Sequence, residues 1–227
     1  TFNINRQRVL DMCHEILERG LRVRWNARVR VHPFDREMLA LMKRAGCQRL
    51  HVGVESLDPA ILEYMQKQIT LAQIHEFFAC CNEVGIDTLA YFILGFPQET
   101  EEYRRTLPRE LRKLRPTYVF MNILCPLLKT PLYEELLKNG TLPDDFWSEY
   151  IRQPTRDFTM PLWRTPELQQ QLIECVDDIH RSFYLSPRFI LQELRRGLTL
   201  RMFLLKAKVA VFLFVKTWLR KLLPAAK

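Results

Sequence analysis

Several apolar segments of this chain end in residues whose side chains could do chemistry. Arg28 lies at the end of one segment, Glu55 and Ser56 at the end of a second, and Gly95 and Pro97 at the end of a third. A guanidinium or a carboxylate can bind charged and hydroxyl groups of a ligand, and a glycine lets another group approach the backbone closely. These residues form one site only if the fold brings the segment ends together.

The spacing of the segments indicates such a fold. Apolar segments recur at residues 25–30, 51–56, 91–100 and 118–126, with an amphipathic helix between each pair. This alternation predicts an α/β fold with a parallel sheet or barrel, in which chemistry gathers at the carboxyl ends of the strands. Four strands do not close a barrel, and residues 1–5 look like the continuation of an earlier strand. We therefore expect the later part of a larger (β/α) barrel.

Local signals place the helix ends. Glycines stand where a residue with positive φ should follow a helix: Gly20, Gly46, Gly85 and Gly140. Capping side chains stand before a proline at the first helical position: Asp58, Thr130 and Thr165.

The organisation of the chain changes after about residue 126. No further strand is evident, prolines divide the next segment, and a helix is predicted over residues 165–183. We expect three regions: barrel strands and helices in residues 1–140, a helical extension in 141–185, and a basic amphipathic tail in 186–227. The hydrophobic content of 48% over 227 residues is enough for a substantial core and excludes a disordered chain.

Residues 1–138 resemble the second half of the barrel of radical S-adenosylmethionine enzymes. The resemblance rests on Gly46-Cys47, on Gly53-Val-Glu-Ser56 with Asp58, Met65 and Lys67, and on Phe92-Ile-Leu-Gly-Phe-Pro-Gln-Glu-Thr100. The most similar branch has a cobalamin-binding domain before the barrel. The resemblance implies a partial, TIM-like barrel of six strands, of which this chain holds the later ones.

The resemblance also implies cofactors. In that family three cysteines on a loop hold a [4Fe-4S] cluster, S-adenosylmethionine yields a 5′-deoxyadenosyl radical, and the cobalamin branch transfers methyl groups. The six cysteines of this chain show no closely spaced triplet, so we expect the cluster ligands and any cobalamin domain to lie outside it, and the fragment alone to be inactive. Scattered cysteines are typical of a reducing, cytoplasmic location.

Site roles follow from the resemblance together with the residue chemistry. Glu55 would face S-adenosylmethionine; the alternative is a buried ion pair with a strand-end arginine such as Arg28. Ser56 would donate to a ribose hydroxyl or satisfy backbone amides at a helix entry. Lys67 would meet the carboxylate of S-adenosylmethionine or remain a solvated surface lysine.

The other two strand ends supply further candidates. Alternation puts Asn26, Arg28 and Arg30 on one face of their strand, and we expect Arg28 to point into the barrel toward an anionic substrate or cofactor group. Gly95 and Pro97 would pack beside the adenine of the cofactor. The chain departs from the family pattern at Gln98 and at residues 127–130, which leaves the substrate side less well defined.

The tail is strongly basic. Residues 194–227 hold nine lysines and arginines and no acid, interleaved with bulky apolar residues. Their uninterrupted apolar run is too short to span a bilayer, so we expect a helix lying on an anionic membrane surface, at the inner face of the membrane. The alternatives are packing on another domain and nucleic-acid binding; the interleaving disfavours nucleic acid.

Three functions remain open from the sequence. The first is a radical S-adenosylmethionine enzyme that acts on a hydrophobic small molecule, by radical chemistry or by methyl transfer through cobalamin. The second is an ordinary (β/α) barrel enzyme, for which no Gly-rich phosphate loop or strand-end lysine is evident. The third is a non-catalytic, membrane-associated relic of the barrel.

Overall fold

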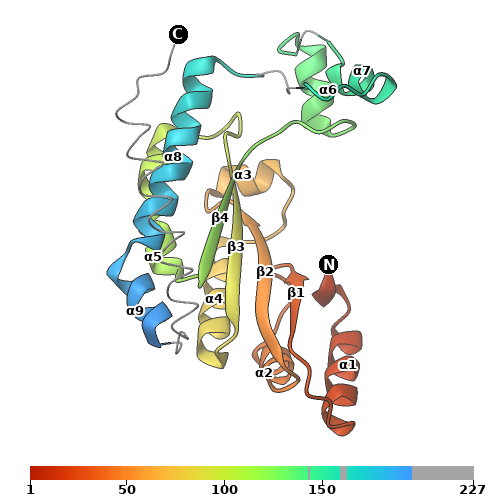
Figure 1. Ribbon diagram of the computed structural model, residues 1–227, viewed down its shortest axis with the longest axis vertical. Helices are drawn as coiled ribbons and strands as arrows, with labels where there is room; N and C mark the ends of the chain where they lie inside the picture. The colour runs from red at the N-terminus through yellow and green to blue at the C-terminus, as the bar shows by residue number, and fades with distance from the viewer. Residues whose placement is uncertain (143, 159–162, 196–227) are drawn as a thin grey trace. The chain divides into compact units, whose positions relative to one another are not determined.

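The computed structural model describes residues 1–142, 144–158 and 163–195. The chain forms two compact units, Thr1–Val176 and Asp177–Lys227. The first unit holds a four-stranded sheet in the order β1-β2-β3-β4, with every neighbouring pair parallel (Figure 1). The strands are β1 (Trp25–Val29), β2 (Cys47–Glu55), β3 (Asp87–Leu94) and β4 (Tyr118–Ile123). The predicted partial α/β barrel is confirmed.

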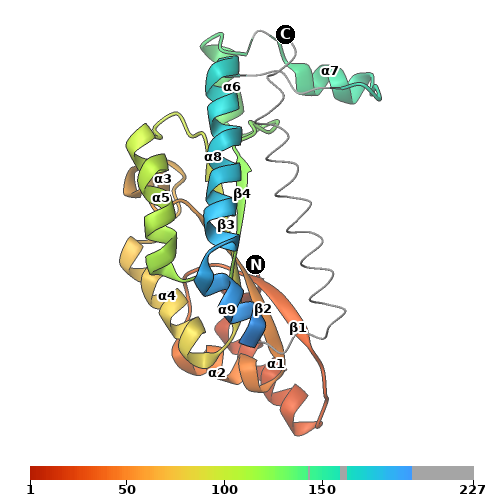
Figure 2. The ribbon, with the colours of Figure 1, turned by 60° about the vertical axis from the view of Figure 1, so that its left-hand side comes forward.

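The helices form a single layer that follows the strand order. The layer consists of α1 (Arg6–Glu18), α2 (Arg36–Arg44), α4 (Leu71–Val84) and α5 (Glu101–Leu114). Neighbours in this series contact one another, and Figure 2 shows α2, α4 and α5 on the same side of the strands. A short 3-10 turn, Phe2–Ile4, precedes α1, and α3 (Pro59–Tyr64) lies between β2 and α4.

Strand alternation divides the side chains between two faces of the sheet. On β2, Leu50, Val52 and Val54 are buried, and Ala90, Phe92 and Leu94 of β3 are equally buried. They form the core with apolar residues of the helix layer, such as Phe77 and Phe78 of α4. The alternate positions point to the opposite face and are more exposed, as expected for the interior surface of a barrel slice.

The helix ends follow the local signals. The four glycines predicted to follow helices all have positive φ: Gly20, Gly46, Gly85 and Gly140. Asp58 and Thr130 accept hydrogen bonds from the first turns of their helices, and Leu168 N donates to Thr165 Oγ1.

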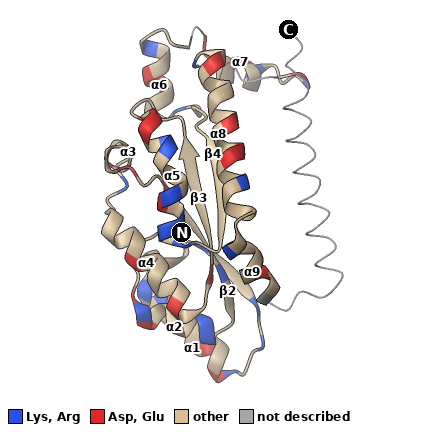
Figure 3. Ribbon diagram, turned by 90° about the vertical axis from the view of Figure 1, so that its left-hand side faces the viewer, with Lys and Arg blue, Asp and Glu red and all other residues tan. Residues whose placement is uncertain are grey.

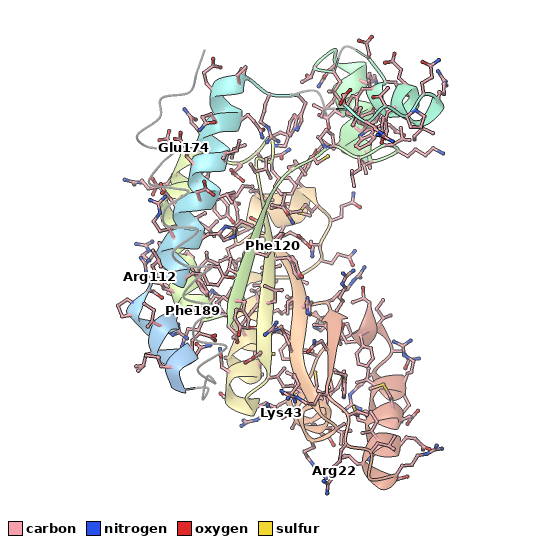
Figure 4. All side chains as sticks on the ribbon, in the orientation of Figure 1. Arg22, Lys43, Arg112, Phe120, Glu174 and Phe189 are labelled. Carbon is pink, nitrogen blue, oxygen red and sulfur yellow. The ribbon has the colours of Figure 1, made fainter. Side chains whose placement is uncertain are left out.

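The outer surface of the helix layer is polar. Figure 3 shows acidic and basic residues interspersed along α1, α2 and α5. Lys43 at the end of α2, labelled in Figure 4, donates to the carbonyl of Gly85.

A small helical subdomain follows β4 within the first unit. It comprises α6 (Pro131–Lys138) and α7 (Phe146–Arg152), which share an apolar cluster of Tyr133, Leu136, Leu142 and Phe146. Trp147 Nε1 donates to the carbonyl of Pro126, which ties the cluster to the end of β4. The helix α8 (Pro166–Tyr184) begins in the first unit and ends in the second, which also contains α9 (Pro187–Arg195).

The basic tail predicted to meet a membrane lies, from residue 196 onward, outside the described residues. Within the described ranges, no helix combines the length and the apolar character needed to cross a bilayer.

Candidate functional site

The end of β2 is distorted around Glu55. The register between β2 and β3 shifts between Gly53 and Glu55, so that Val54 is the extra residue of a bulge. Glu55 itself has φ +68°, a left-handed conformation that a glutamate rarely adopts. Its carboxylate folds back over Gly53, where an added Cβ would lie 2.5 Å from Glu55 Oε1. A glycine at 53 is therefore required for this position of the carboxylate.

Lys67 is held against this carboxylate. Its Nζ lies 3.1 Å from Glu55 Oε1 and 2.6 Å from the carbonyl oxygen of Gly53. The two side chains are only 22% and 20% exposed. The residues on either side of the lysine, Gln66 and Gln68, both have φ +52°. Strained non-glycine backbone of this kind clusters at functional sites, and here three instances surround one ion pair.

The pair retains capacity for a ligand. An ammonium has three donors, and two are used by Gly53 and Glu55; Glu55 Oε2 has no hydrogen bond among the described residues. A zwitterionic amino acid group, such as the methionyl end of S-adenosylmethionine, fits one free donor beside one free acceptor. The alternative for Glu55 was an ion pair with a strand-end arginine such as Arg28; the structure pairs Glu55 with Lys67 instead.

Ser56 lies in the interior. Its side chain is fully buried; Ser56 Oγ accepts from the amide of Asp58 at 3.0 Å and donates to Tyr103 Oη at 3.0 Å. Tyr103 also accepts from the amide of Leu57, and burial raises the pKa of its hydroxyl to about 12. Of the two roles predicted for Ser56, the structure shows the hydrogen bond to a backbone amide at the entry of a helix. We therefore assign no ligand to Ser56.

The end of β3 carries a buried acid. Gly95 has φ +91°, and its amide donates to Glu99 Oε2 at 2.8 Å. The Glu99 side chain is 0% exposed, and Arg104 Nη1 donates to its other oxygen at 3.0 Å. Burial raises the pKa of Glu99, and the contacts with Arg104 and Gly95 oppose this shift. Pro97 lies between these residues on the exposed side of the loop.

An arginine from beyond the barrel strands completes this end of the sheet. Arg164 Nη2 donates to the carbonyl oxygens of Gly95 and Leu124, each at 3.1 Å, at the ends of β3 and β4. Its guanidinium lies over the ring of Trp163 at 4.0 Å, and burial lowers its pKa to about 10. A Cβ at Gly95 would meet Arg164 Nη1 at 2.8 Å and Leu172 Cδ1 at 2.9 Å. The close approach predicted at Gly95 exists, and the group that approaches belongs to the protein.

Arg28 lies on the exposed face of β1, opposite the helix layer. It pairs in register with His51 of β2, and the pKa of His51 is lowered by burial and then by the positive charges of Arg49 and Arg28. His51 Nδ1 is 2.9 Å from the hydroxyl of Tyr91. From the sequence alone, no role was predicted for His51 or Tyr91. Strand alternation, which puts both on the same face of neighbouring strands, was the sequence signal that could have indicated their contact.

The described residues do not fit an iron-sulfur cluster. Within them no three metal-ligating side chains gather at one point. Burial raises the pKa of Cys13 to about 11 and that of Cys47 to about 12, which keeps these thiols protonated. No step is therefore assigned to cluster chemistry in this part of the protein.

Comparison with known proteins identifies the family. Residues 1–111 match the sequence model of the Radical SAM superfamily. An uncharacterized methyltransferase of Pyrococcus horikoshii is 31% identical over 194 residues, which cover 86% of this chain and 41% of that protein. Residues 1–111 thus place this part of the chain with the radical SAM superfamily, a family that uses S-adenosylmethionine and a [4Fe-4S] cluster.

Further relatives support the same placement. The anaerobic magnesium-protoporphyrin IX monomethyl ester cyclase of Cereibacter sphaeroides is 28% identical over 188 residues, covering 81% of this chain and 29% of the cyclase. The fold matches that of TsrM, a radical S-adenosylmethionine methyltransferase of Kitasatospora setae solved with tryptophan and a SAM analogue. The TM-score is 0.53 and the sequence identity is 20%, and the match covers 81% of this chain and 34% of TsrM. The chain thus spans less than half the length of these relatives.

Proposed function

We propose that this chain is the later part of the barrel of a radical SAM enzyme that transfers a methyl group through cobalamin to a hydrophobic small molecule. The proposal of methyl transfer is supported by the name of the Pyrococcus horikoshii relative and by the fold of TsrM, a structure of which holds cobalamin and a [4Fe-4S] cluster. The cluster and cobalamin are assigned to parts of the protein that its longer relatives possess and this chain lacks.

The Glu55–Lys67 pair is the observation that carries the proposal. The free donor of Lys67 would bind the carboxylate of S-adenosylmethionine, and the free oxygen of Glu55 would accept from its ammonium or ribose hydroxyls. The bulge at Gly53 and the left-handed backbone at Glu55 fix the carboxylate before the cofactor arrives. When bound, S-adenosylmethionine supplies the methyl group or the 5′-deoxyadenosyl radical. Gly95 and Pro97 stay predicted neighbours of the adenine of S-adenosylmethionine, and Arg28 stays a predicted contact of an anionic substrate or cofactor group.

Cofactor binding by the full-length protein tests this role. Glu55→Ala and Lys67→Ala should each weaken S-adenosylmethionine binding by about 10-fold, since each removes a charge-assisted hydrogen bond. Glu63→Ala is the matched control, because Glu63 is an exposed acid in the intervening helix α3. Binding is measured by equilibrium dialysis, with iron content and circular dichroism as checks. Unchanged affinity in both variants, with the fold intact, would refute the role of the pair.

We also propose that residues 194–227 attach the enzyme to the anionic inner surface of a membrane. Nine cations without an acid, interleaved with apolar side chains, support the proposal. Attachment to a membrane surface is consistent with a hydrophobic substrate. If the full-length protein does not bind S-adenosylmethionine, the alternative function, a membrane-associated relic of the barrel without catalysis, takes its place.

A further inference from the structure

The face of the sheet opposite the helix layer carries an unusual cluster of side chains. Arg28 of β1 and His51 of β2 are partners in register, and Arg49 lies two residues before His51 on the same face. His51 reaches the hydroxyl of Tyr91 on β3 at 2.9 Å, and the Tyr91 ring lies 5.6 Å from that of Phe120 on β4. Four strands thus contribute to one surface, and Figure 4 labels Phe120 on β4.

The cluster carries two arginines on neighbouring strands. Within the described part of the chain, no ion pair joins a carboxylate to Arg28 or Arg49, and Asp87 of β3 is the register partner of Arg49. Arg49 lies over the ring of Tyr118 at 4.3 Å, and its Nε is shielded from solvent without a hydrogen-bond partner among the described residues. A buried donor without a partner is costly, so an acceptor supplied by a ligand would stabilise it. Burial, and after it the charges of Arg49 and Arg28, lower the pKa of His51, which favours the neutral imidazole with one donor and one acceptor.

The shape of the cluster is defined by the strand register. Gly53 pairs with Tyr91, and Tyr91 pairs with Phe120, so one level of the sheet consists of a glycine followed by two aromatic rings. The place of a side chain at 53 is taken by the Glu55 carboxylate and by Lys67 Nζ, so the cofactor pair lies at this level of the sheet. Phe120 is 46% exposed, which is high for a phenylalanine in a strand. This level follows the Arg28–His51 level along β2, and the Glu55–Lys67 pair lies over its glycine.

We propose that this surface binds the substrate, and that the substrate is an organic acid with a flat, apolar body. The acid group lies against Arg28 and His51, and the flat body packs on Tyr91 and Phe120. This inference rests on the proposed function, because it places the substrate next to the cofactor pair at the end of β2. It narrows the substrate from any hydrophobic molecule to one that carries an anionic group.

Binding of simple probes to the full-length protein tests the inference by calorimetry. The probes are 1-naphthoate, which is flat and anionic; 1-naphthamide, which is flat and neutral; and acetate, which is anionic without a ring. We expect 1-naphthoate to bind about 10-fold tighter than either of the others. Arg28→Gln should weaken 1-naphthoate by about 10-fold and leave 1-naphthamide unchanged, whereas Phe120→Leu should weaken both naphthalene probes. Arg36→Gln, on the outer helix α2, is the control and should change neither.

The two proposals fail in different ways. S-adenosylmethionine affinity should stay normal in Arg28→Gln, and 1-naphthoate affinity should stay normal in Glu55→Ala. If 1-naphthoate does not bind, or binds equally well to Arg28→Gln, the substrate surface is refuted while the cofactor role of Glu55 stands. If Arg28→Gln weakens S-adenosylmethionine and not 1-naphthoate, Arg28 serves the cofactor and the inference is overturned.

Discussion

Gly95→Ala should destabilise the barrel far more than a comparable change at another left-handed glycine. An alanine at 95 must adopt φ +91°, which costs about 1–2 kcal/mol. Its Cβ would also lie 2.8 Å from Arg164 Nη1 and 2.9 Å from Leu172 Cδ1, and overpacking of this kind costs about 1–3 kcal/mol more. The total is about 2–5 kcal/mol.

Gly85→Ala is the matched control. Gly85 has φ +77°, and an added Cβ there meets nothing within 4 Å, so only the backbone term applies. The difference between the two variants isolates the contact with Arg164 and Leu172. At about 2–4 °C per kcal/mol for a domain of this size, Gly95→Ala should melt roughly 2–12 °C below Gly85→Ala. Thermal unfolding followed by circular dichroism measures this difference.

A double-mutant cycle assigns the cause. In an Arg164→Ala background the guanidinium is absent, and the excess cost of Gly95→Ala should shrink, since residues in contact are not additive. Two results would refute the packing of Arg164 on the end of β3. One is an equal melting temperature for Gly95→Ala and Gly85→Ala; the other is an excess destabilisation by Gly95→Ala that stays the same in the Arg164→Ala background.

Three further results are expected. Burial raises the pKa of Glu99 above its usual 4.5, so the folded state binds this proton more tightly than the unfolded state. The free energy of unfolding of the wild type, relative to that of Glu99→Gln, should therefore rise as pH falls from neutral toward 4.5. Denaturation at several pH values measures this difference, and a fall over the same pH range would contradict the prediction. Cys13 and Cys47, with pKa values raised to about 11 and 12, should resist iodoacetamide at pH 8 in the native protein and react only after unfolding, as mass spectrometry can establish. The tail, residues 194–227, should bind anionic vesicles in preference to neutral ones, less strongly at high salt, with a blue shift of Trp218 emission; vesicles without effect would remove the membrane proposal.

Local signals in the sequence were sufficient for the elements of the barrel. Helix ends at Gly20 and Gly85 and the cap at Thr130 depend on residues within one turn, so their spacing predicts them directly. Strand alternation likewise placed Arg28 on the face opposite Ala27. The family motif pointed to Glu55 and Lys67 separately.

The contacts of the site depend on information that local patterns lack. The direct pairing of Glu55 with Lys67 requires a bulge and non-glycine residues with positive φ, and neither has a sequence signal. Arg164 bonds Gly95 from 69 residues away, and no periodicity connects the two. The link between His51 and Tyr91 depends on the register of β2 and β3, which only the assembled sheet defines.

The left-handed backbone on both sides of Lys67 restricts which sequences can replace this loop. Gln66 and Gln68 have φ +52°, where valine, isoleucine and threonine clash with their own backbone. Among relatives that keep a lysine aligned with Lys67, we expect glycine, asparagine, aspartate or other unbranched residues at both flanking positions. A β-branched residue at either position would mark a relative in which the lysine no longer reaches the strand end, even where the lysine itself is retained.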